Sequence, residues 1–174
     1  IEYLIKKNKI VHIIGKGRLR NNSQILVESE EKSETIDAEF IFIATGAHPK
    51  SFPGLDFDSN RIISSKEAML MQSIPKKIII IGSGAIGCEF SYYFNEFGSE
   101  VHLMEAEKNI LPLEDNDISL ELEKNFKNSN IFIYKHCKVL KIESFKSRVK
   151  VYYIKKNKEE ILEGDYALLS IGVT

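Results

Sequence analysis

Cysteine is scarce in this sequence, whose 174 residues include only Cys88 and Cys137. The two lie far apart, and neither belongs to a C-x-x-C pair or to a spacing typical of zinc ligands. The sequence therefore gives no sign of a cysteine-based metal site. We expect both residues to be buried or partly buried free thiols in a reducing compartment.

An excess of charge is also lacking, because 24 lysines and arginines are balanced by 25 aspartates and glutamates, for a net charge of -1. This balance gives no general attraction to nucleic acid or to anionic membranes, so we expect neither as a partner. The longest apolar runs, such as 40–44 and 78–81, have the length of a strand. A membrane helix needs roughly 20 apolar residues.

The most informative segment is a glycine-rich turn, Gly82-Ser83-Gly84-Ala85-Ile86-Gly87, which follows the apolar run 78–81. It fits the pattern G-x-G-x-x-G, and a helical pattern begins behind it. In such a turn the first glycine allows a tight exit from the strand. The second lets the backbone approach a pyrophosphate, and the third lets the helix pack closely on the strand. The helix N-terminus adds free N–H groups for the phosphates, so the segment predicts a dinucleotide site.

An acidic residue follows where a dinucleotide site needs one. Glu105 stands at the end of the next apolar run, 101–104. A carboxylate there accepts hydrogen bonds from the adenosine ribose 2′-OH and repels a 2′-phosphate. The nearest cation is Lys108, and no arginine lies beside Glu105. The site is therefore predicted to prefer NAD over NADP.

Two kinds of titratable residue allow less definite interpretations. Glu89 lies in the first turn of the predicted helix, where it is either a surface carboxylate placed well on the helix dipole or a group facing the nicotinamide.

No two of the four histidines show ligand spacing. We expect the histidines at the surface or at strand ends, and no metal site.

Two parts of the chain are separated by a loop around Pro49 and Pro53, and we predict domains 1–48 and 49–174. The sequence begins without a methionine, shows no signal peptide, and stops directly after a strand-like run, so we expect a fragment. In the first part we predict a helix within 1–7 and strands at 10–14, 25–28 and 40–44, the first two as an antiparallel hairpin. In the second part we predict helices at 65–71, 85–97 and from 116, and strands at 77–81, 100–104, 131–134, 139–143, 149–154 and 166–171.

A weak internal repeat links the two parts. Residues 10–46 and 137–172 each read as a hairpin, a charged turn, an apolar strand and a glycine. Two interpretations stay open: chance similarity of two meanders, or two related nucleotide-binding folds of which the first has lost its front end.

These residues resemble the FAD-dependent pyridine nucleotide–disulfide oxidoreductases, and within them the dihydrolipoamide dehydrogenases. The resemblance covers essentially the whole chain and rests on the segments 44–46, 74–90, 97–99, 101–105, 110–115 and 170–172. It implies an α/β fold. A Rossmann-like NAD-binding domain with a parallel sheet, helices and a β-meander would be preceded by the trailing β-meander of an incomplete FAD-binding domain.

The resemblance also implies which residues contact the cofactors. Glu105 would hold the adenosine ribose, Val139 would lie near adenine, and Gly172 near nicotinamide. Glu89 resembles a carboxylate that pairs with a flavin-side lysine, which this chain lacks. The implied NAD set is Gly82, Ser83, Gly84, Ala85, Ile86, Gly87, Cys88, Glu89, Glu105, Val139 and Gly172. The implied FAD set is Gly17, Thr45, Gly46 and Ala47.

Several family features are missing from the sequence. The first glycine fingerprint for FAD, the C-x4-C redox pair and the C-terminal domain with its catalytic His-Glu pair are absent, and Cys88 and Cys137 do not match the redox pair. We therefore expect no catalytic residue in this chain, no activity of the chain alone, and at most weak FAD binding.

The resemblance implies partners for the intact protein. These are NAD(H), dihydrolipoamide on a lipoyl domain of a 2-oxoacid dehydrogenase complex, and a second copy in a homodimer, in the bacterial cytoplasm or the mitochondrial matrix. Two alternatives remain. One is the NAD domain of a related reductase acting on mercury, glutathione or oxygen, and the other is a free-standing NAD-binding module without catalysis.

Overall fold

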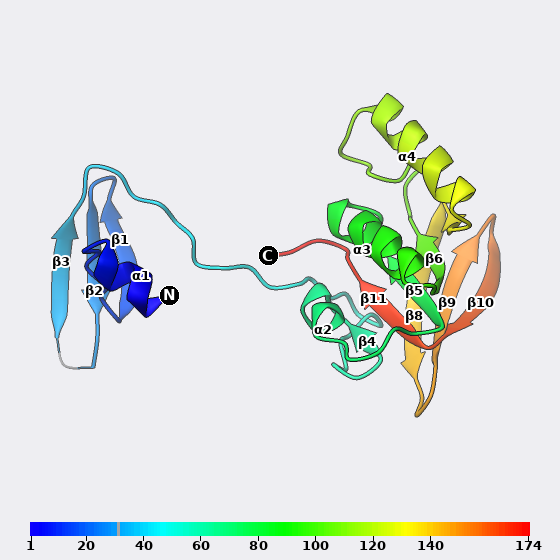
Figure 1. Cartoon of the computed structure of the whole chain (residues 1–174), viewed down its shortest axis with the longest axis horizontal. Coiled ribbons are helices and arrows are strands. Elements are labelled where there is room, and N and C mark those ends of the chain that lie inside the picture. The colour runs from blue at the N-terminus through cyan, green and yellow to red at the C-terminus, as the bar shows by residue number, and fades with distance from the viewer. Residues whose placement is uncertain (31) are drawn as a thin grey trace. The chain divides into compact units, whose positions relative to one another are not determined.

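The computed structural model describes residues 1–30 and 32–174, which form two units, Ile1–Gly46 and Ala47–Thr174 (Figure 1). The junction lies just before the domain boundary expected between residues 48 and 49. Gly46 at this junction has a left-handed backbone with φ of +85°, a conformation that glycine adopts without strain.

The first unit is a three-stranded antiparallel sheet with one short helix. The sheet has the order β1-β2-β3, and the helix predicted within 1–7 is confirmed. The elements are α1 Glu2–Lys7, β1 Lys16–Asn21, β2 Gln24–Glu28 and β3 Ser33–Asp37. A tight turn joins β1 to β2, and there the Ser23 N–H donates to Asn21 Oδ1 at 2.9 Å.

Two of the strands predicted in the first unit are wrong. Residues 10–14 and 40–44 lie outside the strands, although the strand predicted at 25–28 is confirmed as β2. The antiparallel partners of β2 are the polar segments Lys16–Asn21 and Ser33–Asp37. An apolar run becomes a strand only beside another strand that takes up its N–H and C=O groups, and among the described residues neither run has such a neighbour.

The second unit is built on a five-stranded sheet in the order β4-β11-β5-β6-β7. All four neighbouring pairs are parallel. The strands are β4 Ile62–Ile63, β5 Lys77–Ile81, β6 Glu100–Met104, β7 Phe132–Tyr134 and β11 Tyr166–Leu169, and the helices are α2 Ser65–Met69, α3 Ala85–Glu96 and α4 Asn116–Asn128. The central strand β5 carries apolar residues at every position after Lys77, as expected for a parallel strand buried on both faces.

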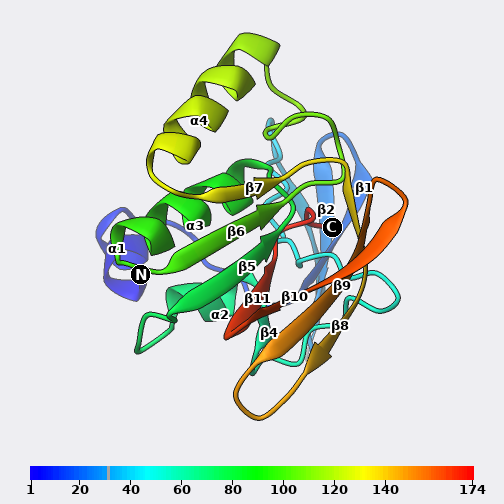
Figure 2. The same cartoon turned by 90° about the vertical axis from the view of Figure 1, so that its right-hand side faces the viewer.

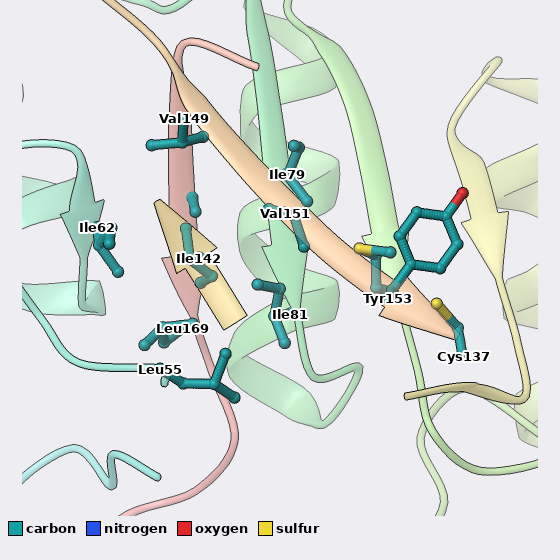
Figure 3. Packing of buried hydrophobic residues seen from close by; sticks show 12 residues of the cluster. Leu55, Ile62, Ile79, Ile81, Cys137, Ile142, Val149, Val151, Tyr153 and Leu169 are labelled. Atoms are coloured by element: carbon teal, nitrogen blue, oxygen red, sulfur yellow. The ribbon is translucent and has the colours of Figure 1, made fainter. Parts of the chain in front are cut away.

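A second antiparallel sheet covers one face of the parallel sheet, and the helices cover the other (Figure 2). Its strands are β8 Cys137–Ser144, β9 Val149–Lys155 and β10 Lys158–Gly164, in the order β10-β9-β8. Along β5, Ile79 and Ile81 pack against this meander (Figure 3), whereas Ile78 and Ile80 pack against the helices. Because side chains alternate along a strand, β5 contributes to a hydrophobic core on each face of the sheet. The predicted α/β fold is confirmed.

Most predicted elements of the second unit are present. The helix at 65–71 is α2, which ends earlier, at Met69, and begins at the N-cap Ser64 in a capping box with Glu67. Strand β10 was not predicted, because only Ile161 and Leu162 interrupt its charged residues. Among the aromatic side chains of α3, Phe94 is fully buried, whereas Tyr92 is 57% exposed.

The two ends of the second unit lie side by side. Residues 48–50 run antiparallel to 172–174, and the N–H groups of His48 and Thr174 donate to each other's carbonyl oxygens at 2.8 Å. The Lys50 N–H donates to the Gly172 carbonyl at 2.9 Å, which ties Gly172 to the segment at the start of this unit. No helix in the described part of the chain is long and apolar enough to cross a membrane.

Candidate dinucleotide-binding site

The glycine turn connects the end of β5 to the start of α3, and its first glycine is required by the backbone. Gly82 has φ of +95°, and a Cβ atom there would lie 2.6 Å from the Ser170 carbonyl oxygen. The Gly82 N–H donates to the Met104 carbonyl at 2.9 Å. Only a residue without a side chain fits between β11 and β6 in this conformation.

The third glycine lets the helix approach the turn. A Cβ atom on Gly87 would lie 1.9 Å from the Gly82 carbonyl oxygen and 2.8 Å from Ser170 Oγ. Real Cβ atoms essentially never come this close to another heavy atom. Gly87 therefore serves the packing of α3 against the strand.

The middle glycine has no such reason within the chain. A Cβ atom on Gly84 would meet no heavy atom of the described residues within 4 Å. Its φ of -66° and ψ of -173° suit any residue. The space above Gly84 is thus a cradle that a side chain would fill, open to a ligand that approaches the backbone.

The chemistry of this cradle suits an anion. Gly84 is the N-cap of α3, and among the described residues no side chain caps it, so the first N–H groups of the helix face outward. These groups and the helix dipole favour negative charge. A cavity of about 420 Å³ lies over the turn and is also lined by Glu105, Pro112, Ser170 and Gly172. The residues present therefore fit the pyrophosphate of a dinucleotide.

Glu105 lies where β6 ends, next to the turn. It is only 7% exposed, and its carboxylate accepts three hydrogen bonds from the chain. Oε2 accepts from the Ser83 N–H at 2.9 Å and from Ser83 Oγ at 2.5 Å, and Oε1 accepts from the Glu107 N–H at 2.9 Å. The carboxylate is fixed beside the turn before any ligand binds.

A second cavity, also of about 420 Å³, extends from Glu105 toward the meander. Val139, Lys138 and Ala106 line it, and it shares Gly82, Glu105 and Ile171 with the cavity over the turn. The two cavities adjoin at the acidic residue. A dinucleotide with its ribose at Glu105 has room for the adenine on one side and for the pyrophosphate on the other.

Three residues of the predicted NAD set do not line these cavities, namely Gly87, which packs against the turn, and the two that follow it. Cys88 and Glu89 line a groove between α3 and α4, not the cavities beside the turn. The Cys88 thiol is buried and donates to the Ser83 carbonyl at 3.2 Å, and burial raises its pKa to about 12. Both cysteines are buried free thiols, as predicted, and burial likewise raises the pKa of Cys137 to about 11.

The residues predicted for FAD lie outside these cavities. Gly17 is on β1 of the first unit, Thr45 and Gly46 end that unit, and Ala47 begins the next. A Cβ atom on Gly17 would make only an ordinary contact of 3.6 Å with Ile25 Cγ2. The packing around Gly17 therefore does not require glycine.

The sequence reasoning missed Ser170. Its Oγ lies within hydrogen-bonding distance of the carbonyl oxygens of Ile81, at 3.0 Å, and Gly82, at 2.7 Å. The hydroxyl therefore fixes the exit of β5 from the neighbouring strand. A signal was present, because Ser170 is a single hydroxyl residue in the apolar run that precedes Gly172.

One histidine differs from the expectation of a surface position. His102 is 4% exposed in β6, where Nε2 lies 2.7 Å from Glu100 Oε1 and Nδ1 lies 3.0 Å from the Tyr134 hydroxyl. Burial lowers the pKa of His102 below its ordinary value. Across residues 1–30 and 32–174, no group of three or more His, Cys, Asp or Glu residues is arranged to hold a metal ion.

Known proteins similar to this chain come from one family. The profile of one family, pyridine nucleotide-disulphide oxidoreductase, matches residues 1–174. Dihydrolipoyl dehydrogenase of Chlamydia trachomatis is 39% identical over 171 residues, which are 97% of this chain and 36% of that protein.

Two solved structures share the fold. LpdA of Mycobacterium tuberculosis matches with a TM-score of 0.75 and 26% identity, over 92% of this chain and 36% of that one. The HOCl-induced flavoprotein disulfide reductase RclA of Escherichia coli matches with a TM-score of 0.71 and 27% identity, over 99% of this chain and 40% of that one. The chain spans little more than a third of the length of these relatives. Because the family profile covers every residue, the chain belongs to the pyridine nucleotide-disulphide oxidoreductase family.

Proposed function

We propose that this chain forms the NAD(H) site of an FAD-dependent disulfide oxidoreductase. The observation that supports this most directly is the cradle at Gly84, where the chain gives no reason of its own for a glycine. The uncapped start of α3 and the fixed carboxylate of Glu105 line the same cavity as Gly84. Together they match the pyrophosphate and the ribose of NAD.

Each residue has a definite task in this proposal. The N–H groups at the start of α3 bind the pyrophosphate, and Glu105 accepts a hydrogen bond from the adenosine ribose. The backbone at Val139 lies beside adenine, and the backbone at Gly172 lies beside nicotinamide. Bound NAD⁺ supplies the hydride acceptor, and the chain binds and orients it.

The remaining assignments concern the flavin. Glu89 would pair with a lysine beside the flavin, outside this sequence. Gly17, Thr45, Gly46 and Ala47 would contact FAD. In this proposal, residues 1–48 belong to the FAD-binding region, and 49–174 form the NAD-binding domain.

The proposed electron donor is dihydrolipoamide, so the intact protein would convert dihydrolipoamide and NAD⁺ to lipoamide and NADH. This choice is supported by the 39% identity to a dihydrolipoyl dehydrogenase over 97% of the chain. The proposed partners are a lipoyl domain of a 2-oxoacid dehydrogenase complex and a second copy of the protein, in the bacterial cytoplasm or the mitochondrial matrix. A second candidate is another flavin disulfide reductase, which the similarity to RclA favours.

Steady-state assays of the intact protein test these assignments. NAD⁺ reduction is measured with dihydrolipoamide, and NADH oxidation is measured with glutathione disulfide, with mercuric ion and with oxygen. We expect NAD⁺ reduction with dihydrolipoamide to be the fastest, and NADP⁺ to be a poor substitute. Faster NADH oxidation with glutathione disulfide, mercuric ion or oxygen would favour the second candidate, another flavin disulfide reductase. NADH binding without flavin and without turnover would instead indicate a binding module.

A further inference from the structure

Ser83 lies inside the glycine turn, but its side chain is not available to a ligand. The residue is fully buried. Its N–H and its hydroxyl both donate to the same atom, Glu105 Oε2, at 2.9 Å and 2.5 Å. The position within the motif suggests a cofactor contact, whereas the geometry directs the side chain to the acidic residue.

The hydrogen bonds among the described residues leave Glu105 with one free acceptor position. A carboxylate has room for about four donors, two on each oxygen. Oε2 takes both of its donors from Ser83, and Oε1 takes one from the Glu107 N–H. Ser83 therefore decides which oxygen faces a ligand, because only Oε1 can accept a further hydrogen bond.

Ser83 is itself held from the opposite side. Its carbonyl oxygen accepts from the Leu111 N–H at 2.8 Å and from the Cys88 thiol at 3.2 Å. These bonds tie it to the loop that follows β6 and to α3. A residue held at this many points provides a fixed template for the carboxylate.

We propose that Ser83 is a positioning residue for cofactor selectivity, which fixes the carboxylate of Glu105 so that Oε1 meets the adenosine ribose. The inference rests on the proposed NAD(H) site and adds a role that the cofactor contacts alone do not give. Without the hydroxyl, one acceptor position of the buried Oε2 has no partner, and the carboxylate loses its fixed direction. The ribose of NADH then loses a well-aligned hydrogen bond. The carboxylate also repels the 2′-phosphate of NADPH less strongly, because its position is no longer fixed.

The test is the binding of NADH and NADPH to the intact protein and to Ser83→Ala, measured by fluorescence titration. We expect NADH to bind about tenfold more weakly to the variant, as loss of one hydrogen bond to a charged group predicts. The Kd of NADPH should change less, so the preference for NADH falls. The matched control is Ser99→Ala, because Ser99 is buried, donates to the Pro75 carbonyl at 2.6 Å and lies at the opposite end of β6. It should leave both affinities unchanged.

A double-mutant cycle separates positioning from general damage to the turn. If Ser83 acts through Glu105, adding Ser83→Ala to Glu105→Ala should change NADH binding by less than about twofold. A tenfold loss in both backgrounds would overturn the proposal, as would unchanged binding of both cofactors in Ser83→Ala alone. If the unmodified protein fails to bind NADH, the proposed function falls as well. Tight NADH binding that Ser83→Ala leaves intact removes only the positioning role.

Discussion

Two glycines of the turn can be separated by experiment, because their surroundings differ. A methyl group on Gly84 meets none of the described atoms within 4 Å, whereas one on Gly87 would stand 1.9 Å from the Gly82 carbonyl oxygen. Gly84→Ala should therefore keep the fold and lose NADH binding. Gly87→Ala should lose stability of the fold itself.

The magnitudes follow from these contacts. At the N-cap, replacing glycine by alanine costs up to about 1 kcal/mol, and the lower entropy of the unfolded chain returns about 0.4–1 kcal/mol. The free energy of unfolding of Gly84→Ala should thus stay within about 1 kcal/mol of the unmodified value. In Gly87→Ala, the contact must open from 1.9 Å to at least 3.0 Å against backbone. Overpacking of this kind costs about 3 kcal/mol or more and lowers Tm by on the order of 10 °C.

Both quantities can be measured on the same preparations, by thermal unfolding followed by circular dichroism and by NADH titration. We expect Gly84→Ala to melt near the unmodified protein and to bind NADH at least about tenfold more weakly, because its methyl group displaces the pyrophosphate from the helix N–H groups. If Gly84→Ala binds NADH as tightly as the unmodified protein, the space above Gly84 does not hold the pyrophosphate. If Gly87→Ala is as stable as the unmodified protein, the described packing of α3 on the turn is wrong.

Further predictions concern three other features. Glu105→Arg replaces a charge that repels a 2′-phosphate by one that attracts it, so titrations with both cofactors should show the preference moving toward NADPH; an unchanged preference would reject Glu105 as the selectivity residue. Since burial raises the pKa of Cys88 to about 12 and that of Cys137 to about 11, iodoacetamide at pH 8 should label neither in the native state and both in denaturant, as read by mass spectrometry. Burial lowers the pKa of His102, so the folded state binds a proton less readily than the unfolded state. Stability should fall as pH drops below the ordinary histidine pKa of about 6.5, and His102→Gln should flatten the slope of Tm against pH. An unchanged slope would mean that other groups cause the pH dependence of stability.

The sequence predicts most of the second unit because its signals are local. The apolar run of β5, the glycine turn and the amphipathic pattern of α3 each lie within a few residues, and the structure confirms the strand and the helix. Strand β10 escaped prediction because its register is set by pairing with β9, which tolerates charged residues on an exposed face. Pairing partners, unlike periodicity, cannot be read from one segment.

The same limit applies to the candidate site. The glycines and Glu105 follow a spacing that can be recognised in the sequence, but their supporting hydrogen bonds come from distant segments. Ser170 reaches the carbonyl oxygen of Gly82 from a strand at the other end of the domain. The local pattern marks Ser170 as a hydroxyl residue within an apolar run, but it does not indicate the bonding partner, since this contact arises only when β11 pairs with β5.

The internal repeat shows how context decides the outcome of one pattern. Each unit contains a three-stranded antiparallel sheet followed by an apolar run and a glycine with positive φ, +85° at Gly46 and +106° at Gly172. In the second unit the apolar run contains β11, because β4 and β5 lie on either side and take up its backbone groups. In the first unit the run 40–44 has no such neighbours among the described residues and is not a strand. Matching sheets and matching glycines favour two related folds over chance similarity, and the missing strand at 40–44 is what a parallel strand without its neighbours should give.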